Sequence, residues 1–237
     1  MSNTILITGA SSGVGYQTAL KLAVENNIVI AVARNKSKLK QLHADATKKN
    51  PKAKLHLIAF DLSSDYSKSL MEELYKLNIN HIDCLINNAG LLISKPFDQL
   101  QLANFKEVYT VNVFAPAMLI QTLLPLLEKS VAPHIINISS MGGVQGSSKF
   151  LGLSAYSSSK SALITLTECL AVELAPRNIK VNCLALGAVN TEMLAAAFPG
   201  YEAPLSASQM AEWISWFALS GQHFFNGKII PVSISNP

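Results

Sequence analysis

The sequence predicts a doubly wound α/β fold, in which one parallel sheet of seven strands has helices on both faces. Three observations favour it. Short β-branched runs alternate with longer segments of helical spacing, the strand runs are almost continuously apolar, and no linker or repeat interrupts the 237 residues. Strands buried on both faces have such apolar patterns, and alternation of strand and helix produces parallel neighbours through right-handed crossovers. We therefore expect a single domain over residues 1–237.

The elements follow one another in a regular order. The predicted strands are residues 4–8 (TILIT), 28–33 (IVIAVA), 54–60 (KLHLIAF), 82–87 (IDCLIN), 134–139 (HIINIS), 179–185 (IKVNCLA) and 227–233 (GKIIPVS). The segments with helical spacing are residues 13–26, 36–49, 65–78, 98–128, 153–175 and 206–220. Each of the first six strands is followed by one such segment, as crossover connections require.

Charged residues are scarce, which bears on assembly and partners. They make up 14% of the chain, whereas typical domains have about 25%. We expect such a chain to bury extra surface in a homodimer or homotetramer. The net charge is +4, and the strongest basic cluster, KKNPKAK at 48–54, surrounds a proline and has no interleaved aromatic residues. We interpret it as a solvated loop and expect no nucleic-acid partner.

Cysteines, histidines and apolar runs indicate a soluble cytoplasmic protein. Cys84, Cys169 and Cys183 stand far apart, so we expect buried free thiols in a reducing compartment. The five histidines lack metal-ligand spacing, and we expect no metal. The first residues, MSNTILITG, do not resemble a signal peptide. The most apolar long run, 113–127, is shorter than the ~20 residues of a membrane span, so we expect a buried or interface helix there.

The first predicted strand is followed by a glycine-rich turn and a helix, TILITGASSGVGYQTALKLA. Gly9, Gly13 and Gly15 leave room for the backbone to approach a pyrophosphate, and they allow the helix to start close to the sheet. The helix N-terminus adds free N–H groups and the positive end of the helix dipole. This context predicts a phosphate-binding turn.

The spacing T-G-x-x-x-G-x-G resembles that of the short-chain dehydrogenase/reductase family. Further motifs of this family follow in order across nearly the whole chain: DL (61–62), NNAG (87–90), VN (111–112), NISS (137–140), YSSSK (156–160) and LGAVNT (186–191). The resemblance implies a Rossmann fold and a nicotinamide cofactor. The cofactor residues that it implies are Thr8, Gly9, Ser11, Ser12, Gly13, Val14, Gly15, Arg34, Asp61, Leu62, Asn88, Ala89, Gly90, Tyr156, Lys160, Gly187, Val189 and Thr191.

The end of the second strand bears on which nicotinamide cofactor is used. An acidic residue there would accept hydrogen bonds from the ribose hydroxyls and repel a 2′-phosphate. This chain has Ala33 and then Arg34 instead, and a guanidinium can hold a phosphate through two parallel hydrogen bonds. We expect NADP(H) to be favoured over NAD(H), with Arg34 responsible for most of the preference.

Tyr156 and Lys160 lie one helical turn apart in SAYSSSK, and therefore on one helix face. Reduction of a carbonyl needs a proton donor, and a nearby ammonium is expected to lower the tyrosine pKa from about 10. The resemblance implies that Tyr156 is the acid/base and that Lys160 also holds the nicotinamide ribose. It further implies that Ser140, with Ser139 as the alternative, bonds the substrate oxygen, and that Asn112 holds a water of a proton relay.

The chain departs from the family pattern in places that concern the substrate. The segment between Ser140 and Tyr156 is a few residues longer than usual, Leu186 replaces the usual proline, and the common V-D-G-G ending is replaced by PVSISNP. The predicted substrate loop, 191–208, has mostly small or apolar side chains, which favours a small-to-medium apolar carbonyl. Such loops are often mobile lids.

The resemblance implies an NADPH-dependent oxidoreductase that transfers a hydride between the nicotinamide and a carbonyl or alcohol. One alternative is a 3-oxoacyl-acyl-carrier-protein reductase, although no arginine cluster suggests a landing surface for the carrier. Another is a cofactor-binding sensor or scaffold without turnover. Such a protein should have lost a catalytic group, whereas Asn112, Ser140, Tyr156 and Lys160 are all present.

Overall fold

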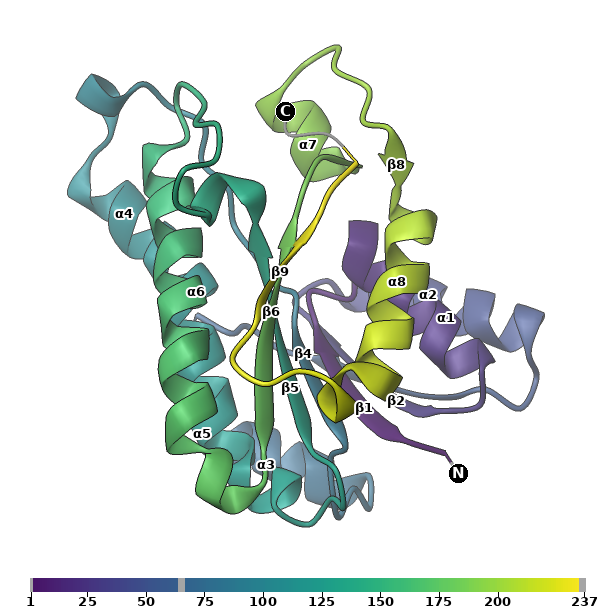
Figure 1. Ribbon diagram of the computed structural model, residues 1–237. Coiled ribbons are helices and arrows are strands. Elements are labelled where there is room, and N and C mark those ends of the chain that lie inside the picture. Colours follow the sequence, from purple (N-terminus) through teal and green to yellow (C-terminus); the bar gives the residue numbers. More distant parts are fainter. Residues whose placement is uncertain (1, 64–66, 235–237) are drawn as a thin grey trace.

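The computed structural model describes residues 2–63 and 67–234, and its centre is a seven-stranded sheet (Figure 1). The strands are β1 (Thr4–Thr8), β2 (Ile28–Ala33), β3 (Lys54–Ala59), β4 (Cys84–Asn87), β5 (His134–Ser140), β6 (Lys180–Leu186) and β9 (Ile229–Val232). They pair in parallel in the order β3-β2-β1-β4-β5-β6-β9. The predicted fold is thereby confirmed, and the order reverses between β1 and β4, where this architecture binds its ligands.

Helices cover both faces of the sheet (Figure 1). One face carries α1 (Gly13–Val24), α2 (Lys36–Lys49) and α8 (Ala207–Ser220), and the other carries α3 (Ser67–Lys76), α5 (Ala115–Leu127) and α6 (Ser154–Glu173). The alternating side chains of β1 separate the two cores, because Ile5 and Ile7 pack on the first face while Leu6 packs on the second. Residues 65 and 66, where the predicted third helix begins, lie outside the described residues.

Two of the three cysteines are buried as expected, Cys84 and Cys183. Cys169 is exposed on α6, so the prediction was wrong for that thiol. The helix period explains the difference, because Cys169 lies two residues after the buried Thr167 and therefore faces away from the sheet.

The predicted helix over 98–128 is not continuous. It consists of a short 3₁₀ turn (Phe97–Gln99), α4 (Leu102–Tyr109), a π-helical turn (Thr110–Phe114) and α5. Gln101 and Asn104 cap the start of α4 reciprocally, so the chain enters a new helix there. Pro116 lacks the N–H that a regular α-helix would direct at the carbonyl of Asn112, which explains why the π turn interrupts the helix at this point.

The run Leu102–Leu127 is, by length and composition alone, the one helical stretch among the described residues that could cross a membrane. Its α5 part belongs to the core, since Leu119, Leu123 and Leu126 are buried in the apolar cluster beneath the sheet. The expectation of a buried or interface helix at 113–127 therefore agrees with the packing of α5.

The predicted substrate loop contains regular structure that the sequence did not indicate. β7 (Val189–Asn190) pairs with β8 (Leu205–Ser206), and α7 (Glu192–Ala197) lies between them. The Asn190 side chain accepts the Ala203 N–H at 2.8 Å and donates to the Ala203 carbonyl at 3.0 Å. These contacts join the two ends of the predicted substrate loop, and α7 lies over the carboxyl ends of the strands (Figure 1).

Candidate active site

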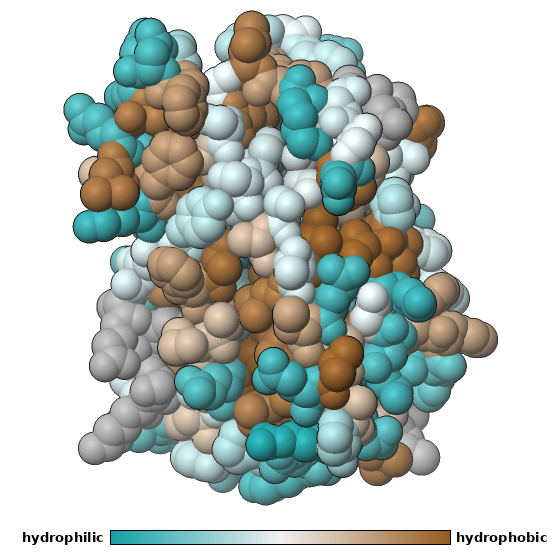
Figure 2. Space-filling model, turned by 60° about the vertical axis from the view of Figure 1, so that its left-hand side comes forward, coloured by the Kyte–Doolittle hydropathy of each residue, from teal (hydrophilic) through white to brown (hydrophobic). Residues whose placement is uncertain are grey.

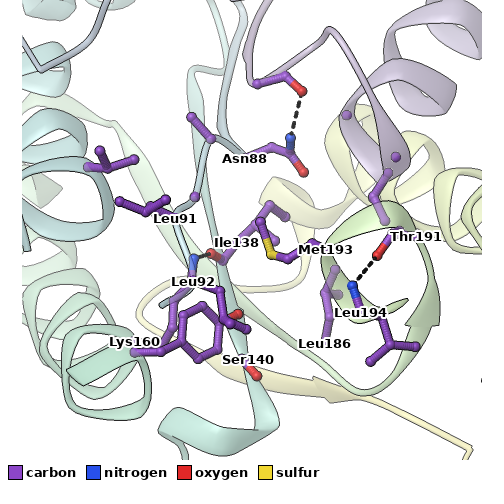
Figure 3. A pocket seen from close by; sticks show the side chains of 18 of the residues that line it. Asn88, Leu91, Leu92, Ile138, Ser140, Lys160, Leu186, Thr191, Met193 and Leu194 are labelled. Carbon is purple, nitrogen blue, oxygen red and sulfur yellow. Dashed lines mark hydrogen bonds between the residues drawn. The ribbon is translucent and has the colours of Figure 1, made fainter. Parts of the chain in front are cut away.

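A cavity of about 790 Å³ lies at the carboxyl ends of the central strands. Its walls come from the glycine turn, the ends of β2 to β6, α6 and the segment that includes α7. Figure 3 shows Asn88, Lys160, Ser140 and Met193 around this space. All the predicted site residues line the cavity except Thr8 and Asn112.

The glycine turn forms a cradle that side chains would fill. Gly9 and Gly13 have φ angles of +69° and +56°, in the left-handed region that glycine adopts without strain. A Cβ on Gly9 would lie 2.8 Å from the Ala89 Cα, and one on Gly15 would collide with the Asn88 amide. The Ser12 side chain does not cap α1, and no acidic residue stands in its first turn, so the N–H groups there suit an anion.

Thr8 supports this cradle from behind the cavity wall. Its Oγ1 accepts hydrogen bonds from the backbone N–H groups of Asn88 and Ala89, each at 3.0 Å. The Asn88 side chain donates in turn to the Thr8 carbonyl at 3.0 Å. Thr8 therefore positions the NNAG segment against the glycine turn and is not itself part of the lining.

The far end of the cavity combines one guanidinium with one carboxylate. Arg34 is exposed on the rim, directly after β2. The backbone N–H and the hydroxyl of Ser63 donate to Asp61 at 2.9 and 2.7 Å, and these bonds, helped by the charge of Arg34, lower the pKa of Asp61. Leu62 and Phe60 complete this wall with apolar surface.

The opposite end contains Tyr156, Ser140 and Lys160. The Lys160 ammonium donates to the Ile138 carbonyl at 2.8 Å (Figure 3) and lies 5.8 Å from the centre of the Tyr156 ring. Burial lowers the pKa of Lys160 to about 8. Burial also raises the pKa of Tyr156, while a hydrogen bond with the Ser140 side chain opposes that rise. The expected lowering of this pKa by Lys160 is therefore wrong for the protein alone, since desolvation of the phenolate is the largest effect and the opposing effect comes from Ser140.

The two candidate serines have different surroundings. Ser139 is buried, and its hydroxyl donates to the Lys160 carbonyl at 2.9 Å, which fastens α6 to β5. Ser140 is the last residue of β5, where it accepts the Gly142 N–H at 3.2 Å and faces Tyr156. This geometry favours Ser140 as the serine that a substrate oxygen would meet.

Asn112 lies behind the cavity in the π turn and is fully buried. Its side chain accepts the Leu91 N–H at 2.8 Å and donates to the Leu91 carbonyl and to the Ser159 hydroxyl, both at 2.9 Å. A Cβ on Gly90 would lie 3.4 Å from the Lys160 ammonium and 3.5 Å from Asn112 Oδ1. The missing side chain at Gly90 thus leaves Asn112 and Lys160 on either side of one small space.

The segment after β6 closes over the glycine turn. A Cβ on Gly13 would lie 3.3 Å from the Thr191 methyl group, and Thr191 Oγ1 accepts the Leu194 N–H at 3.2 Å to begin α7 (Figure 3). Leu186 replaces the usual proline without leaving the turn loose. The Gly187 N–H is bonded to the Val232 carbonyl at 3.0 Å, so the C-terminal strand holds it.

Half of the apolar wall beside Tyr156 comes from the predicted substrate loop, which contributes Met193, Leu194, Phe198 and Tyr201. Sequence reasoning missed the other half, whose residues share no motif: Leu91, Leu92, Phe150 and Leu153. Phe150 and Phe198 meet edge to face with ring centres 5.3 Å apart, so the segment before α6 contacts the end of α7.

Within residues 2–63 and 67–234, no group of three or more His, Cys, Asp or Glu side chains could hold a metal.

Comparison with known proteins agrees with this architecture. A family model described as short chain dehydrogenase matches residues 3–202. The 3-oxoacyl-(acyl-carrier-protein) reductase FabG of Aquifex aeolicus is 36% identical over 191 residues, which cover 80% of this chain and 75% of that protein. An uncharacterized oxidoreductase of Escherichia coli, YciK, is 35% identical over 198 residues, covering 82% and 77% of the two chains.

Solved structures of similar proteins agree over almost the whole chain. A short chain dehydrogenase from Shigella flexneri in complex with NADP has a TM-score of 0.87 at 30% identity, covering 97% of this chain and 96% of that one. One from Escherichia coli in complex with NADPH has the same TM-score and identity, covering 97% and 95%.

Proposed function

The chain belongs to the short-chain dehydrogenase family and is an oxidoreductase, and from that premise we propose that it is an NADP(H)-dependent reductase of small-to-medium carbonyl compounds. The observation that carries this proposal is the meeting of Ser140, Tyr156 and Lys160 in the same cavity as the glycine cradle. The apolar wall beside Tyr156 supports an apolar carbonyl substrate.

The residues that line the cavity support a nicotinamide cofactor bound along its length. Gly9, Gly13 and the start of α1 would hold the pyrophosphate, Asp61 and Leu62 the adenosine, and Lys160 the nicotinamide ribose. Gly187, Val189 and Thr191 would lie on the nicotinamide side. When bound, the nicotinamide supplies or accepts the hydride at the carbon of the substrate C–O group.

Proton transfer is assigned to Tyr156. The raised pKa keeps its hydroxyl protonated at neutral pH, so the hydroxyl can donate a proton to the substrate oxygen during reduction. Ser140 would donate a hydrogen bond to the same oxygen and stabilise its developing charge. Lys160, with a pKa of about 8, is still mostly protonated at neutral pH and would favour the phenolate that reduction leaves behind.

Asn112 is proposed to act through the space at Gly90. Its side chain is already engaged by Leu91 and Ser159, so its role there is to position the backbone beside the Lys160 ammonium. A water in that space would link Lys160 to solvent and return a proton after each turnover.

The preference for NADP(H) rests on Arg34. The residue before it, at the end of β2, is Ala33, so no carboxylate at that position repels a 2′-phosphate. The relatives with bound NADP and NADPH support the same choice.

Assembly and location are also proposals. Exposed apolar side chains on α4, the π turn, α5 and α6 support a homodimer or homotetramer: Leu102, Phe114, Met118 and Val172. Figure 2, which brings this side forward, shows brown apolar patches beside polar ones. We propose a soluble cytoplasmic protein. Light scattering after gel filtration would measure the mass in solution, and a single monomer peak would contradict the proposed homodimer or homotetramer.

A second candidate is reduction of 3-oxoacyl groups on a carrier protein. Its support is the 36% identity with the Aquifex aeolicus reductase of that name. A non-catalytic NADP(H) sensor remains the alternative of a different class, and the catalytic side chains gathered in the cavity count against it.

Oxidation of NADPH, followed by absorbance over a panel of aldehydes, ketones and 3-oxoacyl thioesters, tests the proposal. Tyr156→Phe should lose roughly 10²–10⁴-fold in turnover because no acid replaces the hydroxyl, while NADPH binding persists. Tyr75→Phe, an exposed tyrosine on α3, is the matched control and should behave as the wild type. Binding of NADPH without turnover of any compound would favour the sensor, and full activity of Tyr156→Phe would refute the mechanism.

A further inference from the structure

A second hollow of about 910 Å³ adjoins the candidate active site. It lies between the segment that follows the short helix Met141–Gly143, the residues 94–97 and the first turns of α6. The hollow and the main cavity share four lining residues, Gly142, Phe150, Leu153 and Ser157. The two spaces therefore meet beside the catalytic residues.

The wall of this hollow is held together by its own hydrogen bonds. The Lys149 ammonium donates to the carbonyls of Val144 and Ser147 at 2.8 and 3.0 Å, and the Ser147 hydroxyl donates to the Val144 carbonyl at 2.9 Å. The Lys95 N–H is bonded to the Gly152 carbonyl at 3.0 Å, so the two loops are joined. The longer segment between Ser140 and Tyr156 thus forms one wall of the hollow, which these hydrogen bonds stabilise.

The two spaces share Gly142 at their boundary. A Cβ there would be crowded at 3.1 Å from Ser157 Oγ and would lie 3.6 Å from Ser140 Oγ, so glycine keeps a side chain away from this boundary next to the proposed oxygen-binding serine. Phe150 stands at the same boundary, where its ring meets Phe198. A chain attached to a carbonyl at Ser140 would therefore reach the hollow across this shared boundary.

The lining of the hollow combines apolar, hydroxyl and positively charged groups. Phe97 and Leu151 are almost fully exposed, at 73% and 101%, and offer apolar surface. Hydroxyl groups come from Ser94, Ser154, Ser157, Ser158 and Ser161. Lys95 and Lys149 are the charged residues of the described lining, which includes no Asp or Glu. An anion is therefore attracted to this space and a cation repelled.

We propose that this hollow, the tail subsite, binds the distal end of carbonyl substrates whose aliphatic chain ends in a carboxylate. The chain would pass Gly142 and cover Leu151 and Phe97, and the carboxylate would meet Lys95 and the serine hydroxyls. Lys149 is already engaged by backbone carbonyls, so Lys95 is the residue that gives the preference. This inference rests on the proposed reductase function, because it places the reacting carbonyl between Ser140 and Tyr156.

The test compares ketones that differ only in the tail. The substrates are 7-oxooctanoate, its methyl ester, and butanone, which is too short to reach the hollow. The wild type should have a higher kcat/KM for the acid than for the ester. Lys95→Met should lower that acid-to-ester ratio by about tenfold, the size of one partly exposed charge contact.

A second pair of variants blocks the hollow. Ser158 lines the hollow and bonds only within α6, so Ser158→Trp should lower the ratio of kcat/KM for 7-oxooctanoate to that for butanone by about tenfold or more. Thr165→Trp, an exposed position two turns further along the same helix, is the matched control and should leave both ratios unchanged. Equal activity on acid and ester, or unchanged ratios in Ser158→Trp and Lys95→Met, would overturn the proposal.

A binding experiment separates this proposal from the proposed function. Calorimetry would follow 7-oxooctanoate binding to Tyr156→Phe loaded with NADP, which needs no turnover. Binding that weakens about tenfold in Tyr156→Phe/Lys95→Met supports the subsite even if no ketone is reduced by the wild type. Turnover of butanone with no detectable binding or preference for the acid refutes the subsite and leaves the reductase standing.

Discussion

Acidification should destabilise this protein through one buried histidine. His134 begins β5, is fully buried, and has its ring against Phe217 at 5.3 Å between centres. Its Nε2 lies 3.1 Å from the Asn182 side-chain amide, so the ring accepts a hydrogen bond in its neutral form. Burial lowers the pKa of His134 to about 4 from the usual 6.5.

The size and sign of the change in stability follow from the lowered pKa of His134. Between pH 6.5 and 4 the unfolded chain binds a proton at this histidine and the folded protein does not, so stability rises with pH in this window. The difference of about 2.5 pH units corresponds to about 3 kcal/mol at 1.36 kcal/mol per unit. The contribution is fully present above pH 6.5 and is lost progressively as the pH falls to 4.

Urea unfolding, followed by the fluorescence of Trp213 and Trp216, would measure this loss at a series of pH values. His134→Phe cannot take up a proton and should lack this part of the pH dependence. We expect it to be less stable at pH 7 by about 1 kcal/mol, because a hydrogen bond to Asn182 is lost. Parallel stability curves for the variant and the wild type between pH 7 and 4 would refute the reasoning.

Three further predictions concern the cofactor site. Lys160→Met should abolish turnover. It should also raise the free energy of unfolding at pH 7 by about 1–3 kcal/mol, because a buried ammonium with a pKa of about 8 is removed. Urea unfolding would measure this gain, and a loss of stability would contradict the argument. Gly15→Ala should weaken NADPH binding at least about tenfold, since the methyl group would displace Asn88 from the cradle; calorimetry with unchanged affinity would count against it. Arg34→Ala should weaken NADPH binding about 10- to 100-fold with little effect on NADH, and equal losses for both cofactors would show that Arg34 does not select the 2′-phosphate.

The sheet and the glycine turn were predictable because they depend on local patterns. A strand buried on both faces must be continuously apolar, and a backbone that approaches a phosphate must have glycine, so both requirements are visible along the chain. The helix before β5 was not predictable to the same degree. Its apolar spacing continues through the π turn, and the consequence of Pro116 for the hydrogen-bond pattern is clear only once the neighbouring elements are in place.

The roles of individual side chains depended on contacts between distant segments. The sequence named Thr8 and Asn112 as site residues, but the fold places both behind the cavity, where they hold the backbones of Asn88 and Leu91. It also left Ser139 and Ser140 as alternatives. The fold separates them, because Ser139 bonds to the backbone of α6 and Ser140 faces Tyr156.

The sequence by itself determined the alternation of sheet strands and helical segments along the chain, the phosphate turn and the reactive groups, since each depends on a few neighbouring residues. Only the tertiary structure decided the pKa direction of Tyr156, the apolar wall around Phe150 and Phe198, and the hollow beside Gly142. Desolvation and cavity shape are set by atoms brought together from separate parts of the chain. No local pattern can contain that information, because the same residues in another packing would have other neighbours.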